Sequence, residues 1–269
     1  MDAEGKIAVL NGAKEFKQFA SELVQVSRAA GRRKLELELP MLIMVTESGR
    51  GNTTYLRLLT ELIREENLLP LSGEEEVFEW RMLAEDEEAV HRLMIRMEKA
   101  SGFYPWFSGV IGLDLSDYKE PEDLPRSLFE LIREHRKKCL FCLMITEKQA
   151  SRFLETLEER LSCCTRVKTI RLSATDRELC RYVRNEFHRR GFLLASDVDD
   201  AIRTFVAEEG SGGYRGLRLA MDEIVWQKMA RNDGQLIDAK DLTAGRQRTG
   251  KTAGSRERKR VIGFGAYEP

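Results

Sequence analysis

The sequence predicts an α/β protein, with an open parallel sheet of five strands flanked by helices and a small all-helical domain after it. Between residues 13 and 172, short apolar or β-branched runs alternate with segments that repeat apolar residues at helical spacing. Alternating strands and helices are typical of parallel sheets. From Thr175 onward the strand-like runs stop and only helical segments follow. We therefore expect an α/β core over residues 1–173, a helical domain over 174–243 and a basic tail over 244–269.

The first expected element is a helix over residues 13–30, followed by Gly31 as a stop signal. Its apolar stripe consists of Phe16, Phe19, Leu23 and Val26. The expected strands then lie at 39–45, 76–83, 108–116, 139–146 and 167–172. The helices between them are expected at 53–66, 87–100, 124–137 and 149–162, and those of the second domain at about 175–190, 196–209 and 214–231.

Composition limits the classes of protein that this chain can represent. The 269 residues carry a net charge of -1, so the overall charge indicates no particular partner. No apolar run approaches the roughly 18 residues that cross a bilayer, and the first residues do not resemble a leader peptide. We expect a soluble, cytoplasmic protein without membrane contact. The five cysteines fit a reducing compartment, and Cys139 and Cys142 should point to opposite faces of a strand, which disfavours redox or zinc chemistry.

Two features stand out in the tail. Residues 245–252, GRQRTGKT, match the phosphate-binding loop pattern G-x-x-x-x-G-K-[ST], but no apolar strand precedes them and no amphipathic helix follows. A solvated basic tail explains this stretch better than a nucleotide site does. The tail then ends in an apolar group made of Val261, Ile262, Phe264 and Tyr267. This segment either folds back onto its own domain or docks on another protein.

A second, degenerate phosphate loop has the strand and helix that the first one lacks. It follows the strand at 39–45 and has Thr46 in place of the first glycine and Asn52 in place of the lysine, while Gly51 and Thr53 match the pattern. The loop and the helix start could still contact phosphate. These residues are Gly49, Arg50, Gly51, Asn52, Thr53 and Thr54. The alternative is a strand-to-helix turn that needs glycine for its geometry alone.

Asp114 ends the third apolar strand, where a carboxylate could hold Mg²⁺ together with Thr53. The alternative is a strand-end cap. Leu115 follows Asp114 at a position where hydrolases with this loop commonly carry a glutamate that polarises water. We therefore assign no catalytic residue.

The order of these features over residues 13–242 resembles the AAA+ ATPase superfamily. The segment GGYRGLR (212–218) is similar to the sensor-2 segment GNARGVR of the sporulation protein K and rubisco-activase-like group, and LIDAKDL is similar to the segment that closes AAA+ lids. The resemblance implies that Arg215 reaches the nucleotide from a helical lid and that Thr146 is the sensor-1 residue. It also implies ATP or ADP with Mg²⁺ as ligand and an oligomer with itself or with related subunits.

The sequence departs from the superfamily at several positions. Ser162, Cys163 and Cys164 occupy the region of the arginine finger, for which Arg160 or Arg166 is the candidate substitute. No aromatic residue is available for a substrate-gripping pore loop. The aromatic residues 102–107 precede the third strand, where they either pack under the sheet or form a docking loop.

These departures favour a hydrolysis-impaired, nucleotide-responsive subunit. A scaffold that binds no nucleotide is the first alternative. A nucleic-acid-associated protein that uses the basic tail is the second.

Overall fold

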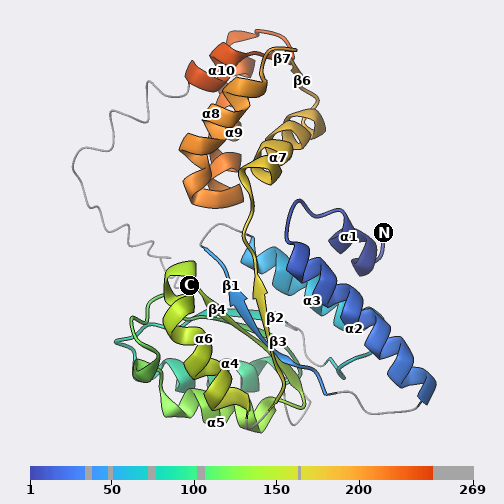
Figure 1. Ribbon diagram of the computed structural model, residues 1–269, viewed down its shortest axis with the longest axis vertical. Coiled ribbons are helices and arrows are strands. Elements are labelled where there is room, and N and C mark those ends of the chain that lie inside the picture. Colours follow the sequence, from blue (N-terminus) through green and yellow to red (C-terminus); the bar gives the residue numbers. More distant parts are fainter. Residues whose placement is uncertain (34–37, 48–50, 72–76, 102–106, 163–164, 245–269) are drawn as a thin grey trace, which may run out of the picture.

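The structure is a computed structural model that describes residues 1–33, 38–47, 51–71, 77–101, 107–162 and 165–244. Figure 1 shows an α/β body with a group of helices placed above one end of its sheet. We call residues 1–173 the core and residues 174–243 the lid. No helix of the described residues is long and apolar enough to cross a membrane.

The core contains the predicted five-stranded parallel sheet. Its strands are β1 (Met41–Val45), β2 (Val77–Arg81), β3 (Gly109–Asp114), β4 (Cys139–Ile145) and β5 (Val167–Arg171). They lie in the order β2-β3-β4-β1-β5 and all pair in parallel. Val45 pairs with Ile145, and Asp114 pairs with Met144. The carboxyl ends of β1, β3 and β4 therefore meet at the sheet edge that faces the lid, the usual place for a ligand in an open α/β sheet (Figure 1).

Helices cover both faces of this sheet. One face carries α1 (Ala3–Ala8), α2 (Lys14–Arg33) and α3 (Asn52–Glu65), and the other carries α4 (Ala89–Ala100), α5 (Arg126–His135) and α6 (Glu147–Ser162). Central strands such as β4 are buried along their whole length, as expected when both faces are covered. Cys139 and Cys142 belong to the two opposite apolar clusters, as predicted. Burial raises the pKa of both thiols, that of Cys139 to about 12, so both stay protonated near neutral pH.

Two glycines fix the position of α3 against the sheet. Gly51 precedes the helix with φ of 91°, a left-handed conformation that side-chain-bearing residues rarely adopt. A Cβ atom on Gly112 of β3 would lie 2.4 Å from Leu56 Cδ1, so a larger residue there would displace the buried Leu56 side chain of α3. The amino end of α3 is thereby held at the carboxyl edge of the sheet.

The first part of the chain differs from the sequence prediction in three ways. Val26 was expected on the buried stripe of the first helix but is 48% exposed, and Val24 is buried there instead. The helix continues through Gly31 to Arg33, because a glycine disfavours a helix without ending it. A short additional helix, α1, precedes it, capped by Asp2 and linked to α3 by Lys6 and Glu61, whose Nζ and Oε2 atoms lie 2.6 Å apart.

The lid is helical, as predicted, with a short further helix that was not predicted and one small addition of β structure. It contains α7 (Asp176–Arg189), α8 (Asp199–Glu209), the short 3₁₀ turn η2 (Gly210–Gly212), α9 (Gly213–Arg231) and α10 (Ala239–Ala244) around an apolar cluster of its own. Thr175 and Glu178 form a capping box that begins α7. The addition is a two-residue parallel pair, β6 (Leu193–Leu194) with β7 (Leu236–Ile237), in segments too short to show a strand pattern.

Candidate functional site

A pocket of about 950 Å³ lies between the carboxyl edge of the sheet and the lid. We call its lower side, formed by the β1–α3 turn and the strand ends, the core wall. We call its upper side, formed by α7 and α9, the lid wall. The loop between α1 and α2 contributes Leu10 and Asn11 at one end. Segments distant in sequence therefore meet at the place where the degenerate phosphate loop was predicted.

The core wall begins at the β1–α3 turn. Thr46 Oγ1 donates a hydrogen bond to Asn52 Oδ1 at 2.7 Å, so the residue in the lysine position is tied to the residue in the first-glycine position. Thr54, also predicted, lines the pocket, and its backbone N–H donates to Gly51 O. Gly49 and Arg50 lie outside the described residues. The described part of the turn therefore contributes a neutral amide where the motif has an ammonium group.

Thr53 was predicted to bind phosphate or Mg²⁺, and its hydroxyl donates a short hydrogen bond to Glu79 Oε2 of β2. Glu79 lines the pocket, and the sequence reasoning did not single it out. Its signal was weak, because one glutamate in an alternating edge strand resembles any solvent-facing residue. The contact places a carboxylate beside the first turn of α3.

Asp114 lies in the pocket at the end of β3, as its position in the sequence predicted. Its Oδ1 accepts the backbone N–H of Ser116 at 2.9 Å, the interaction expected of a strand-end cap. Leu115 is fully buried, so it presents no polar group to a water molecule. The geometry is compatible with both expectations for Asp114, since its second carboxylate oxygen has no hydrogen bond from the described residues.

Thr146, the proposed sensor-1 residue, also lines the pocket, but its polar groups cap the start of α6. Its N–H and hydroxyl both donate to Gln149 Oε1, at 2.8 and 2.9 Å, and its Oγ1 accepts the N–H of Gln149. This reciprocal pattern is a capping box, which satisfies otherwise unpaired amides at a helix start. Gln149 also donates to the carbonyls of Leu115 and Tyr118, so the pair joins α6 to the segment after β3.

The lid wall is formed mainly by one face of α9. Arg215, Arg218, Leu219 and Asp222 project into the pocket from successive turns of this helix. Arg190, which caps the end of α7, forms an ion pair with Asp222 at 2.6 Å and also bonds Glu186 at 2.9 Å, which fixes α9 against α7. Neither the Arg215 nor the Arg218 guanidinium forms a hydrogen bond or an ion pair with a described residue. The lid wall therefore presents two uncompensated positive charges to the pocket.

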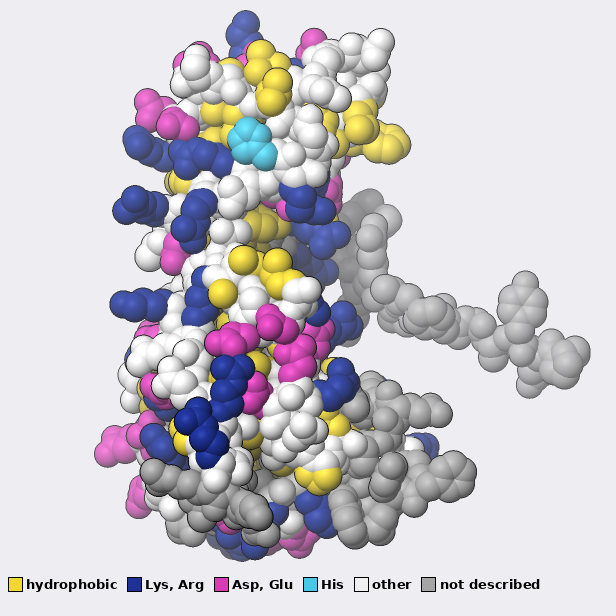
Figure 2. Space-filling model, turned by 90° about the vertical axis from the view of Figure 1, so that its right-hand side faces the viewer, with side chains coloured by type: hydrophobic (Ala, Val, Ile, Leu, Met, Phe, Trp, Pro, Cys, Tyr) yellow, Lys and Arg dark blue, Asp and Glu magenta, His cyan; other side chains and the backbone are white. Residues whose placement is uncertain are grey.

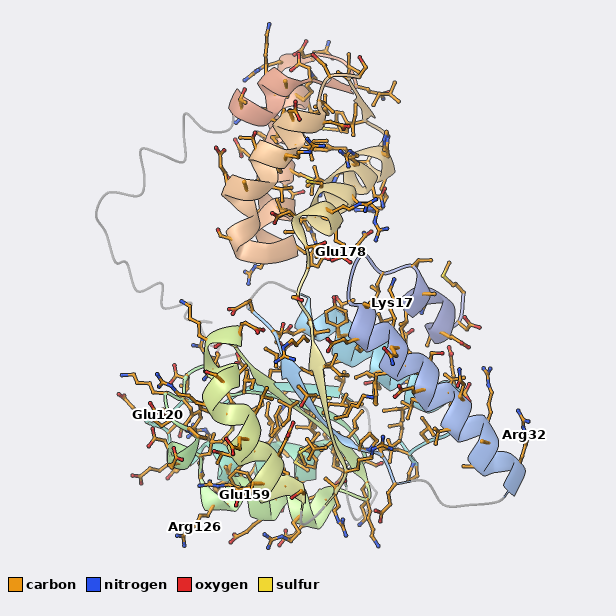
Figure 3. The ribbon with its side chains drawn as sticks, in the orientation of Figure 1. Lys17, Arg32, Glu120, Arg126, Glu159 and Glu178 are labelled. Carbon is orange, nitrogen blue, oxygen red and sulfur yellow. The ribbon has the colours of Figure 1, made fainter. Side chains whose placement is uncertain are left out.

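The α1–α2 loop joins the core to the lid. Lys17 Nζ donates to the carbonyls of Ala8 and Leu10, at 2.8 and 2.7 Å, and this holds the loop in place. Tyr214, at the start of α9, donates its hydroxyl to Asn11 O at 2.9 Å and stacks edge-on against Tyr182. Figure 3 shows Lys17 and Glu178 near the junction, on the core and lid sides respectively. This loop and the two tyrosines are pocket components that sequence reasoning missed.

The residues present fit a phosphate-bearing ligand better than they fit a metal ion. The volume is within the range of pockets that hold small ligands, and two free guanidinium groups could neutralise phosphate. A Mg²⁺ ion bound here would contact Asp114, Glu79 and the Thr53 hydroxyl. The described residues contain no group of three or more His, Cys, Asp or Glu placed to hold a metal by themselves, so Mg²⁺ would depend on phosphate oxygens for the rest of its ligands.

Other predicted features lie away from this pocket or outside the described residues. Arg160, a possible substitute for the arginine finger, stacks on the Phe129 ring in the core. Of the aromatic residues at 102–107, only Phe107 is described, and it packs under the sheet against Phe78. Cys163, Cys164, the GRQRTGKT stretch and Val261, Ile262, Phe264 and Tyr267 lie outside the described residues.

Comparison with known proteins identifies the fold. No family model matches the sequence, and no curated protein matches it. A point mutant of RuvB from Thermotoga maritima is similar in structure, with a TM-score of 0.56 and 13% identity over 90% of this chain and 71% of that chain. ORC2 of Aeropyrum pernix, in ADPNP and ADP complexes, has a TM-score of 0.56 and 14% identity over 91% of this chain and 69% of that chain. At this identity the similarity shows the fold alone, and that fold is the AAA+ fold.

Proposed function

We propose that this protein binds an adenine nucleotide between the core and the lid and hydrolyses it weakly or not at all. In this proposal, residues 1–173 form the nucleotide-binding core, residues 174–243 the lid and residues 244–269 a basic tail. The nucleotide changes how the lid sits on the core, and the protein works in an oligomer with itself or with related AAA+ subunits. The proposed contacts are Gly49, Arg50, Gly51, Asn52, Thr53, Thr54, Thr146 and Arg215, with Asp114 and Thr53 toward Mg²⁺.

The pair of unpaired arginines on the lid wall carries this proposal. A guanidinium group without a carboxylate partner, directed into a pocket, favours an anionic ligand with several oxygens. The amino end of α3 lies opposite and adds a favourable helix dipole. Phosphate between α3 and α9 would therefore contact favourable charge from both sides.

Weak hydrolysis follows from what the core wall lacks. Asn52 cannot neutralise charge that develops on a transferring phosphoryl group, and buried Leu115 cannot orient water. When bound, Mg²⁺ would neutralise part of the phosphate charge. The chain's own residues would bind and orient the nucleotide, and the buried Leu115 leaves the described core wall without a general base next to Asp114.

A scaffold that binds no nucleotide is the second candidate, and the hydrogen bonds of the core wall favour it. Thr46 is paired with Asn52, Thr53 with Glu79, and Thr146 with Gln149, so each of these side chains already has a partner in the protein. A ligand would have to break or extend these bonds. The nucleic-acid alternative depends on the basic tail, which lies outside the described residues.

Thermal denaturation with ligands tests the proposal. A ligand that binds only the folded chain stabilises it, by about 2.7 kcal/mol at a ligand concentration of a hundred times Kd. This stabilisation raises the melting temperature. We expect ATP and ADP to raise the melting temperature of the wild-type protein, with Mg²⁺ and with EDTA. If neither nucleotide does so at millimolar concentration, the scaffold is the better description.

A matched pair of variants checks that the effect arises in the pocket. We expect the double variant Arg215→Gln, Arg218→Gln to lose most of the shift, because the lid wall then carries no free cation. Arg181→Gln serves as the control, since Arg181 is an exposed arginine of the same domain that does not line the pocket. Equal loss in both variants would indicate a general charge effect and would contradict the proposed site. Sedimentation of the wild-type protein with and without ADP tests the oligomer.

A further inference from the structure

Helix α9 has an exposed apolar face that continues away from the pocket. Leu219 lies at the pocket edge and is 60% exposed, and Trp226 and Met229 follow about two and three turns further on the same side, 72% and 68% exposed. The opposite side of α9 packs into the lid through Leu217, Met221 and Ile224. Hydrophobic side chains also reach the surface of the lid in the face drawn in Figure 2. We call Leu219, Trp226 and Met229 the α9 patch.

We propose that the terminal segment of this chain, residues 261–269 (VIGFGAYEP), docks on the α9 patch of its own lid. Val261, Ile262, Phe264 and Tyr267 supply apolar and aromatic side chains at the end of an otherwise polar tail. Packing Phe264 or Tyr267 against Trp226 would remove apolar surface of both side chains from water. It would also allow a favourable contact between the aromatic rings. The inference does not depend on nucleotide binding.

The place where the tail begins supports this occupant. Lys228 is buried within α9, and its Nζ lies 2.7 Å from Asp241 Oδ2 of α10 and 3.4 Å from Asp233 Oδ2. This ion pair fixes α10 beside the C-terminal part of α9. Lys228 directly precedes Met229 in the sequence. The last described residue, Ala244, ends α10. The tail therefore starts about one helix-packing distance, roughly 10 Å, from α9, on the side of that helix opposite the patch, and in this proposal residues 245–260 lead around the helix.

The length of the tether also matches the distance. Residues 245–260 lie between α10 and the apolar segment. A flexible chain of that length has an end-to-end distance of about 22 Å, and α9 is about 28 Å long. The segment can reach the whole patch without extending fully, so its effective concentration there is on the order of millimolar. A second copy would reach that concentration only in a very concentrated solution, which is why we assign the patch to the same chain.

Charge around the patch is compatible with the tether. Residues 246–260 contain seven Arg or Lys and one Glu. The lid near the patch exposes Glu223 and Asp233 but also Arg218 and Arg231, so acidic and basic side chains balance there. Attraction across solvent is weak and salt-dependent, so charge neither favours nor opposes the docking.

Fluorine NMR with 5-fluorotryptophan can test the docking directly. The chain has three tryptophans, and the Trp226 resonance is identified by its loss in Trp226→Phe. In a chain that ends at Arg260 we expect the Trp226 resonance to move toward that of a solvent-exposed tryptophan, while the Trp80 resonance stays. The synthetic peptide VIGFGAYEP should reverse the change in the truncated chain, with saturation. The full chain should need at least about tenfold more peptide for any response, because its own segment competes.

Two variants separate the patch from a general effect of an apolar surface. Met229→Ser should reduce the difference between the full and truncated chains. Leu193→Ser should leave it unchanged, because Leu193 is an equally exposed apolar residue of the lid outside the patch. Identical Trp226 resonances in the full and truncated chains would overturn the proposal. A resonance that changes on dilution of the full chain would also overturn it and would assign the patch to a second copy.

Discussion

The two walls of the pocket differ in how far their polar groups are already used. On the core wall, Thr46, Thr53 and Thr146 each bond another side chain, and the acidic groups Glu79 and Asp114 lie among them. On the lid wall, Arg215 and Arg218 have no ion-pair partner among the described residues. The threonine side chains of the core wall are therefore already used in hydrogen bonds within the protein, while the two arginines of the lid wall remain available to a ligand.

This difference changes which part of the AAA+ fold would hold a phosphate group. A lysine in the loop would bind phosphate from the core side. Here the positive charge comes from the lid, which follows β5 in the chain. Ligand affinity should then depend on the position and stability of the lid.

The largest effect is expected from Lys228, which supports the lid wall from behind. Lys228→Met leaves Asp241, whose side chain is only 10% exposed, without its cation, which should cost about 3 kcal/mol of lid stability. The change would be measured as a loss of unfolding free energy in urea. Lys240→Met is the control, because Lys240 is exposed on α10. Equal effects of the two substitutions would show that the buried pair does not anchor α10.

The next effect tests the core wall. Asn52→Lys replaces a neutral amide with an ammonium group at the start of α3, and we expect nucleotide affinity to rise about tenfold, or about 1.4 kcal/mol. Titration calorimetry with ADP would measure it, and Asn52→Gln, which adds no charge, should not show the gain. If Asn52→Lys still binds nothing, the turn lacks the shape of a phosphate loop and the scaffold is favoured.

A smaller effect concerns the link between α7 and α9. Hydrogen bonds from Arg189 and Arg190 hold the pKa of Glu186 at about 2, below its usual value of 4.5. A lowered pKa stabilises the folded state above the unfolded-state value, and this stability is lost as pH falls from about 4.5 toward 2. We expect Glu186→Gln to cost about 1 kcal/mol near neutral pH. The difference from wild type should vanish near pH 2, as measured by denaturant unfolding across this range. A difference that is constant with pH would contradict this role of the charge.

Two substitutions should have no effect on nucleotide chemistry. ATP turnover should stay at background in the wild-type protein, and Asp114→Ala should not change it, because the core wall lacks the lysine and the glutamate. Ordinary ATPase rates that Asp114→Ala abolishes would contradict this expectation in a phosphate-release assay. Lys251→Ala, in the GRQRTGKT stretch, should leave nucleotide binding unchanged, and a loss of binding there would place the site in the tail.

The sequence was sufficient for the sheet and its helices because their signals are local. The runs that form β1 and β4 are apolar throughout, and the run of β3 is apolar or glycine up to Asp114, while the helices between them repeat apolar residues every three or four positions. Helix α1 has only six residues, too few for a periodic signal, and its position depends on a salt bridge to α3. Val24 replaces Val26 on the buried side because packing decides between neighbouring residues.

The pocket was predictable only in part, for a similar reason. Thr53, Asp114 and Arg215 follow from motif positions, and all of them line the pocket. Glu79, Asn11 and Tyr214 have no motif, and they join the site through contacts with residues far away in sequence. The pairing of Thr46 with Asn52 depends on the turn that the chain makes between them, which no residue pattern specifies.

The hydrogen bond from Tyr214 to Asn11 joins residues that are 203 positions apart. On a ribosome that adds about 5–20 residues per second, Asn11 is made roughly 10–40 s before its partner. The core can complete its sheet once β5 has emerged, while the α1–α2 loop still lacks the lid above it. During synthesis the pocket therefore closes last, and for that interval its core wall remains open to any small molecule or chaperone that reaches the nascent chain.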